Sequence, residues 1–264
     1  MKSKTTESGQ VVLASCLDFL PTLEANSVDL VFGSPPYEDV RTYGIDFCLK
    51  GQAWVDWMVE VVRASLRVCR GAACFVVEGK TEDFNYTATP FMLVADLKPA
   101  GITLRKPKLY KRNGIMGSGG PDDFRNDYEL IVVATNGGKL PWSDNLACGK
   151  PPVCKPGGKP TNRNKQGERA TQSKPVDVKI ANPGNVIDCG AVGGGNMGGD
   201  YYTAQNEAPF PEHLAEFFVR SWCPPGGIVL DPFCGSGTTS AVAVRHGRRY
   251  LTCDVRASQC KLAF

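Results

Sequence analysis

The apolar residues along the chain follow two periods, which predict buried strands alternating with amphipathic helices. Residues 28–32 form a run rich in Val, Leu and Phe that stops at Gly33, as a buried strand does. Over residues 54–69 the apolar side chains recur at helical spacing with charged residues opposite them, which predicts an amphipathic helix. We expect that helix to end at Gly71, before a second buried strand over residues 73–77.

The same alternation returns towards the C-terminus after a long interruption. Pro211 is a suitable first-turn residue for a helix that carries Leu214 and Phe218 on one face. The remaining predicted elements are a helix over 91–97, a strand over 129–134, a strand over 227–231, a helix over 238–246 and a strand over 250–254. Strands that alternate with helices imply an α/β fold, with a largely parallel sheet covered on both faces.

The interruption, residues 139–205, has neither period and is rich in Gly, Pro, Asn, Lys and Arg. One interpretation is a disordered loop. Over residues 139–179 its charge is one-sided, because nine basic residues face only Asp144, Glu168 and Asp177. The basic residues are Lys139, Lys150, Lys155, Lys159, Arg163, Lys165, Arg169, Lys174 and Lys179. We therefore favour an insertion that contacts the phosphates of a nucleic acid.

Composition narrows the class of protein. The chain has 264 residues, of which 42% are hydrophobic and 22% charged, as in ordinary globular proteins. No apolar run approaches the roughly 18 residues that span a membrane, and the N-terminus is polar, so we expect a cytoplasmic protein without a membrane partner. The 11 cysteines lack metal-binding spacing and only two histidines exist, so we expect free thiols and no metal site.

The sharpest motif is Asp-Pro-Phe-Cys-Gly-Ser-Gly-Thr-Thr at residues 231–239, between a predicted strand and a predicted helix. Gly235 and Gly237 allow a tight turn and close approach of a ligand. A P-loop would need a lysine before the Ser/Thr, and a dinucleotide site would need a third glycine, where Ser240 stands. A nucleoside-bearing ligand with an amino-acid tail is the third interpretation, with Asp254 placed to hold its ribose. A glycine turn without a ligand is the alternative.

A second motif, Ser34-Pro35-Pro36-Tyr37, directly follows the strand predicted over residues 28–33. Consecutive prolines hold an extended backbone that cannot join a helix. Taken alone, the motif predicts only a rigid loop. Ligands of parallel sheets bind at the carboxyl ends of the strands, so we expect this loop and the glycine-rich loop to converge at one sheet edge.

Together the two motifs resemble those of the DNA amino-methyltransferases that use S-adenosylmethionine, found in restriction-modification systems and phages. In that family [DNS]-Pro-Pro-[YFW] is the catalytic motif and Asp-Pro-Phe-x-Gly-x-Gly-Thr the cofactor motif. Residues 206–211, 111–114 and 124–129 are similar to further motifs of the family. The catalytic motif comes first here and the target-recognition stretch lies between the two, which is the circularly permuted order of the β class. The resemblance implies a Rossmann-like, mostly parallel methyltransferase sheet with an inserted target-recognition segment.

The resemblance also implies an organisation and a set of partners. Residues 1–138 would form the catalytic half of the domain, residues 139–205 the basic target-recognition insertion, and residues 206–264 the cofactor-binding half. Double-stranded DNA is the expected substrate. A second copy of the chain and a cognate restriction endonuclease are further partners that the resemblance suggests, for a bacterial or phage-encoded, nucleoid-associated protein.

The family's chemistry assigns roles to individual residues. Ser34 Oγ and the Pro35 carbonyl would accept the two hydrogens of an exocyclic amine. Pro36 belongs to the same catalytic motif, and Tyr37, which follows it, would stack on the flipped base. S-Adenosylmethionine contacts are expected at Phe210, Pro211, Asp231, Pro232, Phe233, Cys234, Gly235, Ser236, Gly237, Thr238 and Asp254. For Asp231, ordering of the loop is the alternative. DNA contacts are expected at Lys111, Arg112, Arg125, Lys155, Lys159, Arg163, Lys165 and Arg169.

Serine at the first motif position resembles the cytosine-N4 enzymes, so the resemblance implies cytosine N4 as the acceptor. Adenine N6 is the alternative, although adenine-N6 enzymes more often carry Asp at this position. A non-catalytic DNA-binding relative is a rival interpretation, because Ala14-Ser15 stand where the family usually has Gly-Asp. Related Asn-Pro-Pro-Tyr motifs modify RNA or protein glutamine, so a different acceptor is a third hypothesis.

Overall fold

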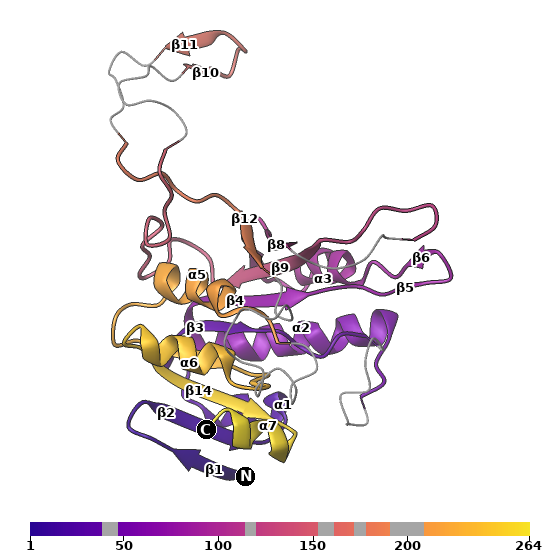
Figure 1. Cartoon of the computed structure of the whole chain (residues 1–264), viewed down its shortest axis with the longest axis vertical. Coiled ribbons are helices and arrows are strands. Elements are labelled where there is room, and N and C mark those ends of the chain that lie inside the picture. Colours follow the sequence, from indigo (N-terminus) through magenta and orange to yellow (C-terminus); the bar gives the residue numbers. More distant parts are fainter. Residues whose placement is uncertain (39–46, 114–119, 153–160, 172–177, 191–208) are drawn as a thin grey trace.

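A ten-stranded sheet forms the centre of the computed structural model, which describes residues 1–38, 47–113, 120–152, 161–171, 178–190 and 209–264 (Figure 1). Its spatial order is β1-β2-β14-β13-β3-β4-β9-β8-β12, with β7 paired to β9. The strands are β1 (Lys2–Thr5), β2 (Gly9–Leu13), β3 (Val28–Gly33), β4 (Cys69–Val77), β7 (Thr103–Leu104), β8 (Lys108–Asn113), β9 (Tyr128–Thr135), β12 (Val186–Gly190), β13 (Ile228–Asp231) and β14 (Arg249–Asp254). Two separate hairpins are β5 (Thr81–Glu82) with β6 (Asn85–Tyr86), and β10 (Thr161–Arg163) with β11 (Arg169–Thr171).

The middle of the sheet is parallel, as expected. Strands β2, β14, β13, β3 and β4 are successive parallel neighbours. Strand β9 reverses the direction, because it runs antiparallel to both β4 and β8. Parallel strands buried on both faces read as continuous apolar runs, which explains why β3 and β4 were clear in the sequence.

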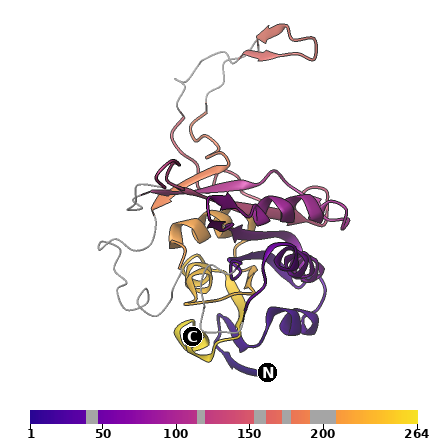
Figure 2. The ribbon, with the colours of Figure 1, turned by 90° about the vertical axis from the view of Figure 1, so that its right-hand side faces the viewer.

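Helices cover both faces of this sheet (Figure 2). They are α1 (Cys16–Phe19), α2 (Gly51–Val68), α3 (Thr89–Leu97), α5 (Glu212–Trp222), α6 (Thr238–Arg245) and α7 (Ala257–Leu262), with a 3₁₀ turn η1 (Leu20–Thr22). On one face Trp54 and Met58 of α2 are fully buried against Phe75. On the other face Phe218 of α5 stacks on Phe32 of β3 with ring centroids 4.9 Å apart. Among the described residues, no helix combines the length and apolar character that crossing a membrane requires.

The boundary between α2 and β4 differs from the prediction. The helix ends at Val68 and β4 begins at once, so Gly71 lies inside the strand instead of ending the helix. A Cβ atom on Gly71 would lie 2.0 Å from the carbonyl oxygen of Asp29. Glycine is therefore required by the close approach of β3, where the pairing register shifts between Val28 and Leu30.

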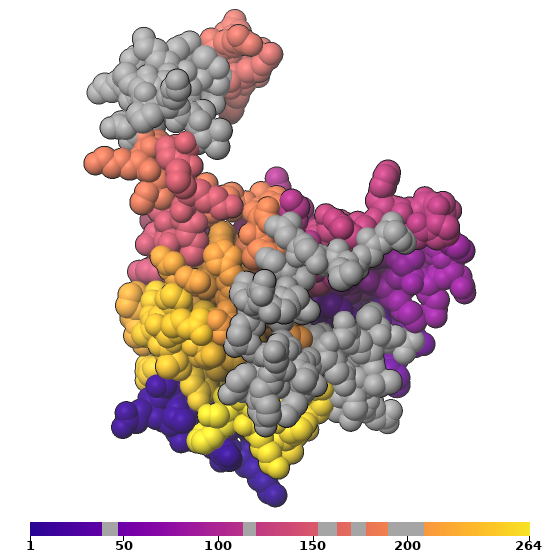
Figure 3. Space-filling view, viewed as in Figure 1, coloured from indigo at the N-terminus to yellow at the C-terminus, as the bar shows by residue number. Residues whose placement is uncertain are grey.

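The basic insertion is more ordered than its composition predicted. Strand β12 pairs in parallel with β8 and forms the last strand of the main sheet. Lys150 and Ala181 exchange backbone hydrogen bonds of 3.1 and 2.8 Å, and we call this closed base of the insertion the neck. The β10–β11 hairpin stands off from the body of the molecule (Figure 3). Residues 139–205 are therefore not separate from the catalytic sheet, since β12 belongs to it.

Candidate active site

The two sequence motifs begin side by side at one edge of the sheet. Strands β3 and β13 are parallel neighbours, with Leu30 opposite Val229 and Val31 opposite Leu230. A Cβ atom on Gly33 would lie 2.4 Å from Oδ1 of Asp231. The loop after β3 and the loop after β13 therefore leave the sheet together, as the sequence predicted.

Ser34 and its neighbours are anchored to β4 and α2. The Ser34 hydroxyl lies within hydrogen-bonding distance of the Val76 carbonyl, at 3.2 Å, and of the Tyr37 hydroxyl, at 3.3 Å. The indole nitrogen of Trp54 donates to the Pro36 carbonyl at 2.9 Å. Because Trp54 is fully buried, this contact fixes the proline backbone against the core.

Tyr37 is hydrogen-bonded to Glu129 of β9, which forms an ion pair with Arg112, and the sequence did not predict either contact. Its hydroxyl donates to Oε2 of Glu129 at 2.9 Å. The other carboxylate oxygen, Oε1, pairs with Nη1 of Arg112 at 3.1 Å, and Nη2 of Arg112 donates to the Asn126 carbonyl at 2.9 Å. A single acid at the start of an otherwise apolar strand was the signal available for Glu129.

Arg112, for which the sequence predicts DNA contact, is mostly covered and pairs with Glu129 and with the Asn126 carbonyl. DNA contact by Arg112 stays a prediction. Charge-assisted pairs of this kind fix the direction of a carboxylate. We therefore assign Arg112 to positioning Glu129, and through it Tyr37.

Two further acids lie behind this edge and were missed. Burial, helped by the negative charge of Glu129, raises the pKa of Glu78 to about 7. Glu38, directly after Tyr37, is only 2% exposed and accepts hydrogen bonds from the Gly51 amide and the Thr89 hydroxyl, both at 2.8 Å. Glu38 thus joins the end of the motif to the first residues of α2 and α3. The sequence offered no periodic signal for either acid.

On the cofactor side, Asp231 is buried at the junction of the two loops. Its Oδ1 accepts the Phe233 amide at 2.9 Å, and burial raises its pKa to about 7. The ring of Phe233 lies between Trp57 and Phe75, with centroid distances of 5.8 and 6.3 Å. These contacts favour loop ordering as the role of Asp231.

The glycine-rich turn is held by the acid at the end of the next strand. The Gly235 amide donates to Oδ2 of Asp254 at 3.0 Å, and the Arg256 amide donates to Oδ1 at 2.8 Å. Gly235 and Gly237 have φ values of 48° and 87°, where glycine is favoured. A carboxylate has about four acceptor positions, and Nε of Arg256 takes a third at 3.4 Å, so one position on Asp254 is left for a ribose hydroxyl.

The other predicted cofactor residues surround the same turn. Phe210 packs edge-on against Phe32 with centroids 5.4 Å apart, and Pro211 precedes α5. Cys234 is buried, and its contact with Cys260 together with burial holds its pKa well above the ordinary value. The remaining members of the predicted set, Pro232, Ser236 and Thr238, lie in the turn or begin α6.

The residues predicted to contact DNA fall into three groups: those paired with acids, those exposed on the β10–β11 hairpin, and those outside the described residues. Lys111 lies 3.6 Å from Asp188 and Arg125 lies 3.7 Å from Asp127, both in half-exposed pairs. The exposed basic residues of the β10–β11 hairpin are Arg163, Lys165 and Arg169. Lys155 and Lys159, like residues 206–208 of the predicted cofactor segment, lie outside the described residues. DNA contact by these side chains stays a prediction.

A parallel sheet with an aromatic Pro-Pro loop and a glycine-rich turn at the same edge defines a Rossmann-like methyltransferase. A family model described as DNA methylase matches residues 28–264, and the chain belongs to this family of N6/N4 amino-methyltransferases. The predicted family of DNA amino-methyltransferases, its fold and its cofactor, S-adenosylmethionine, are thereby confirmed, while cytosine N4 as the acceptor stays a prediction. The substrate of the family is DNA.

Individual relatives cover most of the chain. It is 28% identical over 247 residues to the orphan methyltransferase M.BamHII of Bacillus amyloliquefaciens, covering 90% of this chain and 87% of that protein. It is 25% identical to the DNA adenine methyltransferase YhdJ of Escherichia coli (strain K12), covering 97% of this chain and 81% of that protein.

Solved structures share the fold. The PvuII DNA methyltransferase, described as cytosine-N4-specific, superposes with a TM-score of 0.74 at 18% identity, covering 98% of this chain and 86% of that one. The putative DNA modification methylase TTHA0409 from Thermus thermophilus, complexed with S-adenosylmethionine, has a TM-score of 0.59 at 20% identity. It covers 96% of this chain and 92% of that one. At these identities the likeness carries the fold alone.

Proposed function

We propose that this protein transfers a methyl group from S-adenosylmethionine to the N4 amine of a cytosine that is flipped out of duplex DNA. The observation that carries the proposal is the contact between the two motif loops, where Gly33 approaches the Asp231 carboxylate. This contact brings a polar loop beside a nucleoside-binding turn. A base amine and a methyl donor meet where the two loops adjoin.

Ser34 and Pro35 activate the amine in this proposal. An exocyclic amine is a weak nucleophile, because its lone pair is delocalised into the ring. Directing its two hydrogens at fixed acceptors favours a tetrahedral nitrogen. With the Ser34 hydroxyl hydrogen directed at the Val76 carbonyl, 3.2 Å away, the lone pairs of Oγ are available to one amine hydrogen. The Pro35 carbonyl takes the other.

Tyr37 supplies the surface on which the base stacks. An extruded base loses its neighbours in the duplex, and an aromatic ring replaces part of that stacking. The ring of Tyr37 is steadied through its hydroxyl by Glu129, and Arg112 steadies Glu129 in turn. No thiolate is required, and the raised pKa of the buried Cys234 agrees with a direct transfer.

The cofactor turn has the groups that S-adenosylmethionine requires. Bound S-adenosylmethionine supplies an electrophilic methyl group on a sulfonium. Asp254 would hold a ribose hydroxyl, Phe233 and Phe210 would contact apolar parts of the ligand, and the positive φ of Gly235 opens the turn. Asp231 holds this turn beside Gly33.

Cytosine is favoured over adenine by the serine at position 34, and the PvuII enzyme of similar fold is described as cytosine-N4-specific. Adenine N6 is the second candidate, because YhdJ, a relative along nearly the whole chain, is named an adenine methyltransferase. Incubating the protein with S-adenosylmethionine and mixed-sequence duplex DNA, then measuring the released nucleosides by mass spectrometry, separates the two. We expect N4-methylcytosine, and N6-methyladenine alone would reverse the assignment of the base.

A Ser34→Ala variant is the matched control for this experiment. It removes the acceptor by deleting a single oxygen atom, so we expect folding to be retained and methylation to fall. Calorimetry tests the rival of a non-catalytic DNA-binding relative: wild-type protein that binds no S-adenosylmethionine at millimolar concentration would favour that rival. Duplex DNA, RNA and protein offered side by side test the acceptor class, with duplex DNA expected.

A further inference from the structure

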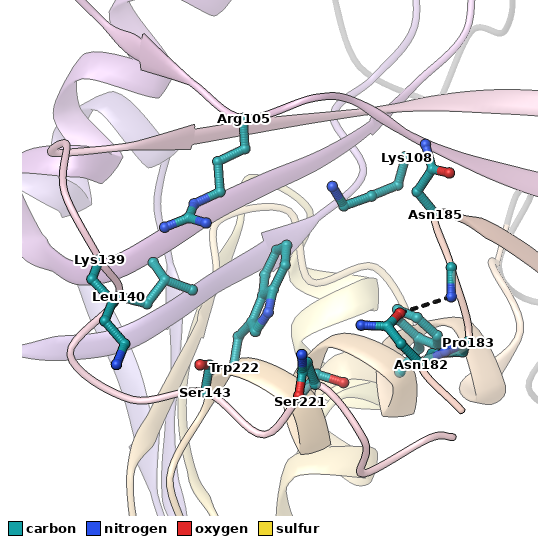
Figure 4. A pocket seen from close by; sticks show the side chains of 13 residues that line it. Arg105, Lys108, Lys139, Leu140, Ser143, Asn182, Pro183, Asn185, Ser221 and Trp222 are labelled. Carbon is teal, nitrogen blue, oxygen red and sulfur yellow. Dashed lines mark hydrogen bonds between the residues drawn. The ribbon is translucent and has the colours of Figure 1, made fainter. Parts of the chain in front are cut away.

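A second pocket lies away from both motif loops, where the last turn of α5 meets the segment before β8 (Figure 4). Its volume is about 450 Å³. The side chains that matter here are Arg105, Lys108, Lys139, Asn182, Asn185 and Trp222. None of them belongs to the site described above, and they come from four separate stretches of the chain.

The pocket carries positive charge without a counter-charge. Arg105 Nη2 donates to the Gly138 carbonyl at 3.1 Å and Lys108 Nζ donates to the Lys106 carbonyl at 2.7 Å. The described residues that line the pocket include no Asp or Glu. Burial and the nearby Arg105 lower the pKa of the half-buried Lys108. Nε of Arg105 is buried without a hydrogen-bond partner among the described residues. Such uncompensated cations favour an anion.

The same pocket offers an aromatic ring and amides. The ammonium of Lys108 lies 5.9 Å from the centre of the Trp222 ring, and Figure 4 shows the Lys108 side chain directed towards that ring. Trp222 is braced by Phe218, with centroids 5.4 Å apart. Asn182 and Asn185 also line the pocket, and amide side chains pair well with the edges of nucleobases.

We propose that this pocket binds a phosphorylated nucleoside, with Arg105 and Lys108 on the phosphate and Trp222 against the base. Arginine and lysine bind phosphate, and an aromatic ring stacks on any base. The nucleotide comes either from a DNA strand or from a free mononucleotide. The DNA source rests on the proposed function, whereas the free nucleotide does not.

The position of the pocket is compatible with one DNA duplex reaching both sites. Glu129, which holds Tyr37, lies near the start of β9, and the carbonyl of Val133 on the same strand accepts the Arg105 amide at 3.0 Å. Four residues of a strand span roughly 13 Å. This corresponds to roughly four base pairs of rise along B-form DNA.

The proposal is tested by measuring how thymidine monophosphate and a DNA duplex bind to two variants, Lys108→Gln and Lys106→Gln. Lys106 is exposed and outside the pocket, so K106Q matches the loss of charge. Calorimetry uses thymidine monophosphate, which has no exocyclic amine to enter the methylation site, with inorganic phosphate for comparison. Fluorescence anisotropy uses a labelled duplex over a range of salt. Circular dichroism checks folding, and Lys139→Gln replaces K108Q if that variant does not fold.

We expect K108Q, and not K106Q, to raise the dissociation constant for thymidine monophosphate about tenfold. DNA is the source of the nucleotide if K108Q changes only the binding of the duplex. In that case the duplex binds more weakly to K108Q, and the slope of its affinity against salt falls by about one. Equal behaviour of the two variants towards both probes overturns the proposal, as does inorganic phosphate binding as tightly as the nucleotide. Methylation by the wild-type protein judges the proposed function separately.

Discussion

At the scale of single residues, the Tyr37 hydroxyl lies between Ser34 and Glu129 and sets the direction of the ring. The motif residues themselves were readable in the sequence, because two prolines after a buried strand are unusual. Their partners were not. Glu129 reaches Tyr37 because β9 pairs with β4, and Arg112 reaches Glu129 because β8 pairs with β9; nothing in local spacing encodes these contacts.

A Tyr37→Phe variant keeps the ring and removes the tether. We expect kcat to fall about tenfold, the effect of losing one charge-assisted hydrogen bond, with unchanged affinity for S-adenosylmethionine. Tyr128→Phe, which removes the hydroxyl of a half-exposed neighbour of Glu129, is the control and should retain full activity. Equal kcat values for Tyr37→Phe and wild type would show that the hydroxyl does not position the ring.

The buried Asp231 predicts a pH-dependent stability. Burial raises its pKa to about 7 from an ordinary value of 3.8, so the folded protein holds this proton more tightly than the unfolded chain. Its contribution to stability is therefore complete at low pH and is lost as pH rises through about 7. Asp231→Asn does not titrate. Between pH 5 and pH 8 its free energy of unfolding should gain about 3 kcal/mol relative to wild type, measured in urea. A difference independent of pH would contradict the assignment.

At the scale of elements, Asp29 joins three neighbouring strands. Its Oδ2 accepts the Ile228 amide of β13 at 2.8 Å, and its Oδ1 accepts Nε of Arg70 on β4 at 2.7 Å. In the sequence Asp29 is only a polar interruption of an apolar run. The strand around it was predictable from that run, but its cross-strand role was not, since Ile228 is far away along the chain.

Asp29→Ala should lower the free energy of unfolding by about 2 to 3 kcal/mol, because it leaves the Ile228 amide without its acceptor. Asp29→Asn keeps an acceptor oxygen and should cost less. Asp56→Ala removes an exposed acid from α2 and serves as the control. Chemical denaturation of the three variants checks this order. If Asp29→Ala and Asp56→Ala are equally stable, Asp29 does not join the strands.

Strand β12 shows the limit of element prediction. Helix α2 and strands β3 and β13 are long or strongly apolar, so periodicity alone located them within a few residues. Strand β12 has five residues in a glycine-rich setting, and its partner β8 lies far earlier in the chain. Short strands are stabilised by such pairings more than by their own composition, which is why the insertion read as unstructured.

At the scale of the whole molecule, the basic hairpin stands apart from the sheet and is suited to contact DNA phosphates. Replacing Arg163, Lys165 and Arg169 together with glutamine should weaken DNA binding and reduce the salt slope by roughly 3, since each phosphate contact contributes about 0.9. Fluorescence anisotropy over a range of salt measures the slope. A slope equal to that of wild type would remove the hairpin from the DNA surface.

The control for this experiment removes the same charge elsewhere. Lys2 lies in β1, Lys98 directly follows α3 and Lys261 lies in α7, and all three are exposed. Their triple glutamine variant should bind DNA with a salt slope close to that of wild type. If both triple variants change the slope equally, net charge and not the hairpin governs binding.

The neck has a consequence for redesign. Lys150 and Ala181 clamp the two ends of the protruding segment, and everything after Ala181 leads back into the sheet through β12. A graft that replaced all of residues 139–205 would remove an edge strand along with the hairpin. A replacement confined to the residues between Lys150 and Ala181 leaves the neck and the main sheet intact. The part of the insertion that can be exchanged is therefore smaller than its composition suggests.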